Sequence, residues 1–163
     1  PAARTPRVAI APAPRAPRPA SFARRGIALF LDLMLLSLLD AVLMMLATTA
    51  VLLAERVTGA RIGGAVQLIR SAVSAGSLTL LVGYFSVLHA RSGQTLGKAA
   101  MQIEVRSANG GRVGILPSVL RTFSYALSLL PFGAGFLLAL LPPQRALHDH
   151  IAGTRVVRVE DHE

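Results

Sequence analysis

The stretch GIALFLDLMLLSLLDAVLMMLATTAVLLA, residues 26–54, decides the fold class of this chain. It is longer than the roughly 20 apolar residues with which an α-helix crosses a bilayer, and far longer than the roughly 7 to 15 of a signal-peptide core. The stretch is therefore predicted to be a helix that spans the membrane and stays in it. It nevertheless contains two carboxylates, Asp32 and Asp40, and a charge at membrane depth is costly unless it is paired or protonated.

The composition of the whole chain also indicates a small integral membrane protein. Of its 163 residues, 53% are hydrophobic and 15% are charged, and the mean hydropathy is +0.56. This is too apolar for an ordinary soluble domain of the same length. The chain has no cysteine, which excludes disulfides and cysteine-ligated metals, and its net charge of +9 comes almost entirely from arginine.

Two further hydrophobic segments follow the first. Residues 66–88 form a second predicted span, and residues 119–141 form a third hydrophobic segment that PFGAG at 131–135 interrupts. Pro131 removes a backbone hydrogen bond from a helix interior, so two alternatives remain for the third segment. It is either one kinked span or a re-entrant pair of half-helices that returns to its starting side. In the second span, small residues share one helix face and predict a surface for helix packing: Ala72, Gly76, Thr79, Gly83 and Ser86.

The distribution of arginine favours the re-entrant alternative. The N-terminal arm and the polar section at 89–118 are both basic, and the positive-inside tendency places both in the cytoplasm. A kinked span would put Arg145, Arg155 and Arg158 outside, whereas a re-entrant pair keeps them inside. The predicted fold is thus an all-α integral membrane protein with two full transmembrane helices, a third Pro/Gly-broken segment and a cytoplasmic N-terminus.

The domain organisation follows from the same segments. Residues 1–20 are rich in Pro, Ala and Arg and are predicted to be a disordered arm, because they can bury little apolar surface. Residues 21–160 form the predicted membrane domain, and residues 161–163 form a short tail.

The polar section between the second and third hydrophobic segments is predicted to form a small cytoplasmic β element. QIEV at 102–105 and RVGIL at 112–116 read as two short strands joined by a turn at NGG. GTRVVRV at 153–159 would add a strand beside the first of them. Just before this element, Thr95 is predicted to cap a short helical turn.

Four motifs in this order carry a resemblance. They are FARRGIALFLD at 22–32, SGQTLGKAAMQIEV at 92–105, LRTFSYALSLLPFGAGFLLAL at 120–140 and RALHDHIAGTRVV at 145–157. Together they resemble the RDD family, small multi-span membrane proteins found chiefly in bacteria and named for one arginine and two aspartates. The resemblance covers about residues 20 to 160 and places the named residues at Arg25, Asp32 and Asp149. It adds a supporting set of matched positions: Gly93, Gln94, Thr95, Gly97, Lys98, Arg121, Gly153 and Thr154.

The charged residues suggest two kinds of role. Arg25 and Asp32 are seven positions apart, so they project on nearly the same side of a helix, roughly 10 Å apart along its axis. We expect them to approach each other, and a re-entrant chain would bring Asp149 to the same place, with Arg121 nearby. A firmly paired Asp32 would be a structural staple, whereas an aspartate whose partner can leave would be a proton or cation site.

Asp40 lies outside the family pattern and near the middle of the first span. Contacts with Ser71, Ser74 or Thr79 of the second span are expected to satisfy it. Asp32 and Asp40 are therefore the candidate ion or proton site. The histidines of HDH at 148–150 point apart, so no metal site is predicted there, and no nucleophile–base arrangement indicates an enzyme.

Two functions remain as alternatives. The resemblance implies a role in transport, in some members as cation/proton exchange, and in others a role as accessory subunits of membrane complexes. Transport through so few spans would require a homo-oligomer or another membrane protein as partner. The expected surroundings are the bacterial inner membrane and its anionic lipid head groups, with no cofactor and no nucleic acid.

Overall fold

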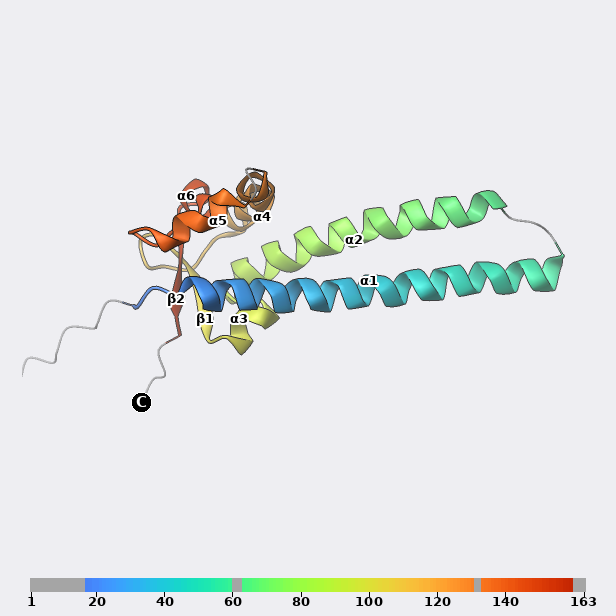
Figure 1. The fold of residues 1–163 in the computed structure, drawn as a ribbon, viewed down its shortest axis with the longest axis horizontal. Helices are drawn as coiled ribbons and strands as arrows, with labels where there is room; N and C mark the ends of the chain where they lie inside the picture. Colours follow the sequence, from blue (N-terminus) through green and yellow to red (C-terminus); the bar gives the residue numbers. More distant parts are fainter. Residues whose placement is uncertain (1–16, 60–62, 131–132, 160–163) are drawn as a thin grey trace, which may run out of the picture.

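A long helical hairpin dominates the computed structural model, which describes residues 17–59, 63–130 and 133–159. Helix α1 (Phe22–Thr58) and helix α2 (Gly63–Arg91) lie side by side and form this hairpin (Figure 1). The Ser21 side chain accepts a hydrogen bond from the Arg24 backbone at the start of α1, and Gly59 ends the helix with a φ of 68°. Both helices are long and apolar enough to cross a membrane, which confirms that each of the two predicted spans forms a helix of the required length and apolarity.

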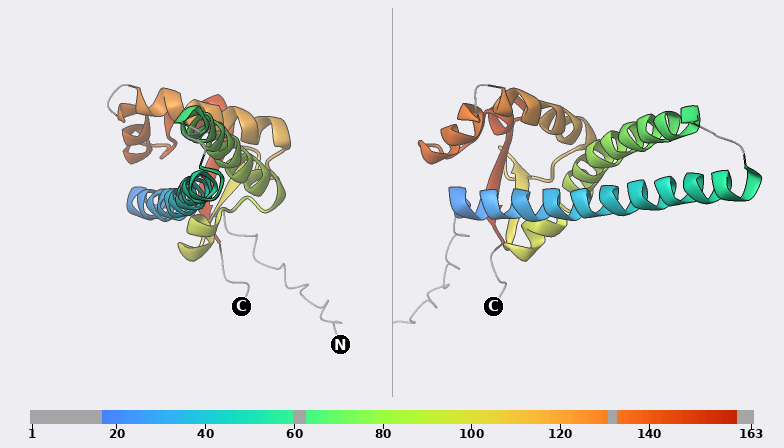
Figure 2. Two further views of the ribbon diagram at one scale, coloured as in Figure 1. Left: turned by 90° about the vertical axis from the view of Figure 1, so that its right-hand side faces the viewer. Right: turned by 45° about the vertical axis from the view of Figure 1, so that its right-hand side comes forward.

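The remaining elements gather at the end of the hairpin where α1 begins and α2 ends (Figures 1 and 2). We call this group, from α3 to β2, the head. Its elements are α3 (Leu96–Ala100), β1 (Ile103–Ser107), α4 (Ile115–Leu129), α5 (Ala134–Leu137), the 3₁₀-helix η1 (Leu138–Leu140), α6 (Leu147–Ile151) and β2 (Thr154–Arg158). The buried apolar core of the protein lies in the head and the start of α1: Ala20, Ala28, Ile103, Val105, Val113 and Val156.

The sheet of the head has two antiparallel strands, β1 and β2, with Val105 opposite Val156. The predicted pairing of 153–159 with the first strand is thus confirmed. The predicted strand at 112–116 is wrong, because Ile115 already begins α4. Pro117 lies in the first turn of that helix, where a missing N–H costs nothing, so the local sequence suits a helix start better than a strand.

The last residues of the predicted arm also lie on the head. Arg158 and Ala20 donate backbone hydrogen bonds to Arg18 and Val156 respectively, at 2.9 and 3.0 Å. Residues 17–20 therefore run along β2 before α1 begins. Residues 1–16 of the predicted arm and the tail at 161–163 lie outside the described residues.

The third hydrophobic segment is broken, as the PFGAG motif predicts. Helix α4 and the helices α5 and η1 make an angle of 113° across the break, which fits either a broken span or a re-entrant loop. Gly135 in α5 packs against the backbone of Ser128, and a Cβ at this glycine would lie 2.5 Å from the Ser128 Cα. Pro131 itself lies outside the described residues.

Candidate functional site

Asp149 is the centre of a buried ion-pair cluster in the head. Its Oδ2 atom lies 3.0 Å from Nη1 of Arg25, and its Oδ1 atom lies 2.5 Å from Nη1 of Arg121. The carboxylate has no solvent exposure and also accepts a hydrogen bond of 3.1 Å from the backbone of Ala146. The structure thus brings together three of the residues predicted to cluster, one from each of α1, α4 and α6.

The electrostatics of this cluster keep Asp149 ionised. Burial alone would raise the pKa of Asp149, but the charges of Arg121 and Arg25 outweigh burial and hold the pKa below its usual value of 3.8. The two arginines offset the cost of removing the Asp149 carboxylate from water. The ion pairs of the cluster therefore join α1, α4 and α6.

Arg25 and Arg121 extend the connection beyond Asp149. Arg25 donates to the backbone carbonyls of Gln144 and Val156 at 2.8 and 3.2 Å. Arg121 donates to Oγ1 of Thr154 at 2.7 Å. These bonds fix both guanidinium groups on protein atoms, as expected for groups that hold a structure together.

Asp32 has different partners from the one expected. Its carboxylate accepts hydrogen bonds from the Tyr84 hydroxyl at 2.7 Å, the Thr95 hydroxyl at 2.5 Å and the Gly97 backbone at 2.7 Å. It is 1% exposed, and no ion pair with Arg25 forms in the described part of the chain. Asp32 is thus a second connection, which joins α1 to α2 and to α3.

Glycine at position 97 makes this arrangement possible. A Cβ there would collide with the carbonyl oxygen of Ala28 and would lie 2.9 Å from the carboxyl group of Asp32. Because Gly97 has no side chain, its N–H reaches the carboxylate directly. Sequence reasoning missed Tyr84, for which the available signal was a phenol within a hydrophobic span, since a buried Tyr hydroxyl usually finds a partner.

The other motif residues shape the segment around α3. Gly93 adopts a φ of 71° and packs against the carbonyl of Val105, while Nε2 of Gln94 donates to the carbonyl of Ile103 at 3.1 Å. Thr95 accepts a bond of 3.4 Å from the Lys98 backbone, which confirms the predicted helix cap. At the other end of the head, Gly153 turns the chain with a φ of 62° just before Thr154.

Lys98 occupies an unusual position for the only lysine of the chain. It is 7% exposed, and its Nζ atom contacts Nε2 of His89 and lies 5.8 Å from the centre of the Phe85 ring. No carboxylate forms a salt bridge with it in the ranges that the structure describes. Burial lowers the pKa of Lys98 below its usual value of 10.5.

The two histidines of the HDH motif have different surroundings. His148 is buried between Tyr125 and Phe136 and shares a hydrogen bond of 3.1 Å with Ser128. Burial, together with the charge of Arg121, lowers the pKa of His148 to about 3, so the ring is neutral at physiological pH. His150 faces another way and lies 3.0 Å from the carbonyl of Ala146.

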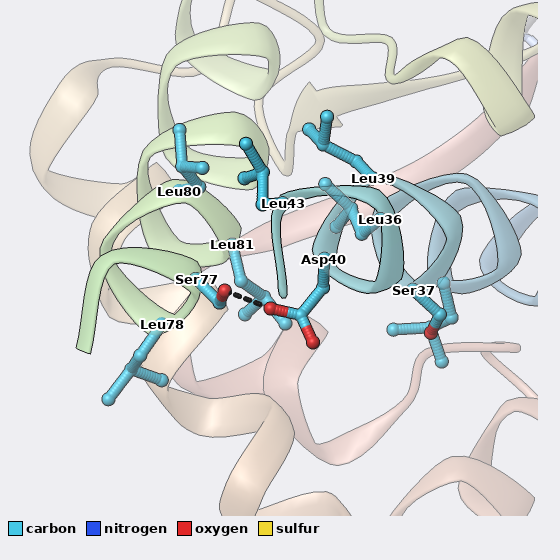
Figure 3. Close-up of a pocket in the computed structure, with 10 residues that line it drawn as sticks. Leu36, Ser37, Leu39, Asp40, Leu43, Ser77, Leu78, Leu80 and Leu81 are labelled. Atoms are coloured by element: carbon cyan, nitrogen blue, oxygen red, sulfur yellow. Dashed lines mark hydrogen bonds between the residues drawn. The ribbon is translucent and has the colours of Figure 1, made fainter. Parts of the chain in front are cut away.

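Asp40 lies apart from the head, between the two hairpin helices. It accepts a hydrogen bond from Ser77, rather than from Ser71, Ser74 or Thr79 as expected, and Figure 3 shows this pair among leucine side chains. The carboxylate lines a cavity of about 350 Å³, together with Ser37 and leucines of both helices. Among the described residues, Asp40 thus has one hydroxyl partner, whereas Asp32 and Asp149 have several partners each.

The amino-acid sequence is similar to known proteins. A family model described as "RDD family" matches residues 19–153. "Uncharacterized protein YxaI" of Bacillus subtilis (strain 168) is 36% identical over 81 residues, which make up 49% of this chain and 54% of that relative. The chain therefore spans about half the length of this curated relative. No solved structure matches the chain.

Proposed function

Because this chain belongs to the RDD family, we propose that it is a multi-pass membrane protein that moves protons or cations and that Asp40 carries the ion. One observation carries the proposal. Asp40 lies midway along the apolar stretch 26–54, opens on a cavity and has one hydroxyl partner among the described residues. A carboxylate at membrane depth is expected to bind a proton or a cation when it lacks a fixed countercharge.

The other two aspartates are poor candidates for the moving ion. Asp149 is neutralised by two arginines, and the oxygens of Asp32 already accept three hydrogen bonds. To bind an ion, either carboxylate would first have to break these buried contacts, at a cost of several kcal/mol. We therefore propose that Asp32 and Asp149 stabilise the fold. Of the two candidates for the ion site, Asp32 and Asp40, we retain Asp40.

A transporter of this size requires more than one chain. Two spanning helices and a broken third segment cannot enclose a path, and the cavity at Asp40 opens between α1 and α2 rather than inside a bundle. A second copy or another membrane protein would complete the wall. In this proposal the protein lies in a bacterial inner membrane with its N-terminus in the cytoplasm, and it is not an enzyme.

The test is a flux assay on the purified protein in sealed liposomes, with separate proton and sodium gradients. Asp40→Asn is expected to abolish the flux while leaving thermal unfolding and elution volume unchanged, because the amide keeps the shape and the bond to Ser77. Glu104→Gln is the matched control, since it makes the same chemical change in the head, outside the spans. Equal flux in wild type and Asp40→Asn would refute Asp40 as the ion site.

The alternative function is that of an accessory subunit that binds other membrane proteins. The extensive bonding of Asp32 and Asp149 favours it, because both residues then serve the fold alone. Part of the small-residue face of α2 also remains open, since a Cβ at Gly76 or Gly83 would meet no atom within 4 Å. Folded wild-type protein that gives no flux under either gradient would favour this alternative.

A further inference from the structure

A second cavity lies in the head, away from Asp40. It has a volume of about 190 Å³ and lies where α1, α3, α4 and α6 converge. Its polar lining includes three cations, Arg25, Lys98 and Arg121, together with Tyr125 and His148. Its apolar lining includes Phe22, Leu29 and Phe136. Both the charge and the apolar walls need an explanation.

The charges around this cavity do not balance. Asp149 compensates part of the charge of Arg25 and Arg121, but two guanidinium groups share this one carboxylate. Lys98 adds a third cation, whose direct contacts are an imidazole and an aromatic ring. Tyr125, Asp32 and Asp149 favour its charged form from a distance, but no carboxylate among the described residues forms a salt bridge with it. Buried cations are normally paired, so the cavity has the electrostatic character of an anion site. An anion placed there would also raise the lowered pKa of Lys98 and so favour its charged form.

The position of the cavity favours a lipid head group as the anion. Arg25 lies four residues after Ser21, the cap of α1, so it stands at the end of the first spanning helix, where lipid head groups lie. The cavity is smaller than the roughly 300 to 1,000 Å³ of typical small-molecule pockets, so it suits one head group rather than a whole lipid. Phe22 and Leu29 offer apolar surface to the part of a lipid that follows its phosphate.

The wall of the cavity is open at Gly26. This residue lines the cavity on α1, and a Cβ at this position would meet no atom within 4 Å. The absent side chain leaves room next to Arg25, on the face of α1 that also carries Leu29. A bulky side chain at position 26 would take up this space.

We propose that the cavity lined by Arg25, Lys98 and Arg121 binds the phosphate head group of an anionic phospholipid. The phosphate would contact Lys98 as its countercharge, while Arg25 and Arg121 remain on Asp149 and supply the surrounding positive field. Binding would join α1, α3 and α4 at the membrane surface. The proposal is independent of ion movement at Asp40 and holds for a transporter and for an accessory subunit alike.

The test is native mass spectrometry of the full chain in a nonionic detergent, titrated with phosphatidylglycerol or with phosphatidylcholine. We expect bound phosphatidylglycerol at concentrations where phosphatidylcholine does not bind, because the choline cation opposes a cationic lining. Inorganic phosphate and glycerol phosphate form separate arms of the experiment. Binding of these soluble anions without binding of phosphatidylglycerol would overturn the assignment to a lipid.

Two variants test the location of the site. Lys98→Met removes the countercharge, and Gly26→Leu fills the cavity without changing any charge. Each is expected to weaken phosphatidylglycerol binding about tenfold or more, the factor expected for loss of a hydrogen bond to a charged group. Gly26→Leu keeps the test decisive even if Lys98→Met does not fold, because leucine favours a helix more than glycine does.

Arg91→Gln is the matched control, because it removes one positive charge from an exposed residue at the head end of α2, outside the cavity. It is expected to bind phosphatidylglycerol like the wild type. Equal binding by the wild type, Gly26→Leu and the control would refute the site and attribute the binding to the general basic surface. Equal binding of phosphatidylcholine and phosphatidylglycerol by the wild type would refute it as well.

Discussion

At the scale of single residues, the buried polar groups of this protein have distinct tasks. Asp149 holds two arginines, Asp32 collects three neutral donors, and His148 stays neutral between aromatic rings. Each group is buried and satisfied, so removing one partner leaves the others without compensation. The residue-scale predictions concern the energetic consequences of such removal.

Asp149→Asn is expected to destabilise the protein strongly. The change leaves Arg25 and Arg121 buried without a countercharge, which costs about 3 to 5 kcal/mol in comparable buried pairs. Thermal unfolding in detergent, followed by circular dichroism, measures the effect. Glu104→Gln is the control, because Glu104 pairs with a partly exposed Arg106 and such pairs contribute about 0 to 1 kcal/mol. A similar loss in both variants would contradict the central role of Asp149.

His148→Gln is expected to weaken the pH dependence of stability. The pKa of His148 is about 3 in the folded protein and has its usual value of 6.5 in the unfolded chain. Between pH 3 and pH 6.5 the unfolded chain therefore binds more protons than the folded protein. Folding stability therefore falls as the pH falls below about 6.5, by roughly 2 kcal/mol for this group between pH 7 and pH 5. Asp149 contributes little in that window, because both its usual pKa of 3.8 and its lowered pKa in the folded protein lie below pH 5.

The measurement for His148 is the unfolding midpoint in denaturant at pH 7 and at pH 5. His148→Gln is expected to lose less stability than the wild type over this interval. His150→Gln is the control, since His150 is exposed and should leave the difference unchanged. An unchanged difference in His148→Gln would show that the ring is not buried in its neutral form.

At the scale of elements, the short helix α3 lies directly against α1. Gly97 provides the contact, since its backbone lies on the Ala28 carbonyl and donates to Asp32. Two helices approach this closely only where one of them lacks a side chain. The position of α3 therefore depends on the absence of a Cβ atom at residue 97.

Gly97→Ala is expected to displace α3 and to destabilise the head, because the new Cβ would overlap backbone atoms that cannot move aside. Gly76→Ala is the matched control, since a Cβ there meets no atom within 4 Å and alanine favours a helix by roughly 0.5 to 1 kcal/mol over glycine. Thermal unfolding of both variants checks the prediction. An equally stable Gly97→Ala would contradict the close packing of α3 on α1.

At the scale of the whole molecule, a hairpin of two long helices projects from the head, which holds the sheet and the broken third hydrophobic segment (Figures 1 and 2). The start of α1, the end of α2 and the sheet all lie at the head end, whereas the end of α1 and the start of α2 lie at the far end. If the hairpin crosses the bilayer, the two ends face opposite sides. The basic residues of the head then favour the cytoplasmic side.

Cysteine labelling tests this orientation without a background signal, because the chain contains no cysteine. Val57→Cys, at the far end of α1 and 79% exposed, is expected to react with a membrane-impermeant maleimide in intact spheroplasts. Arg112→Cys, exposed in the head, is expected to react only after permeabilisation. The reverse pattern would place the head outside the cell.

The sequence by itself determined the family of the protein, its two long apolar helices and the break in the third hydrophobic segment. These follow from local properties, namely hydrophobic length, proline and glycine, and motif spacing. The strand at 112–116 failed because an apolar run of this length suits either a strand or the start of a helix.

Only the tertiary structure decided which charged residues meet. Arg25 and Asp32 share a helix face, yet Arg25 turns to Asp149, more than a hundred residues away, and Asp32 turns to α2 and α3. Spacing along one helix can place two residues on the same side, but it cannot show what another segment brings to them. The partners of a buried charge depend on which donors the fold delivers to it, and that is settled only when all the helices pack together.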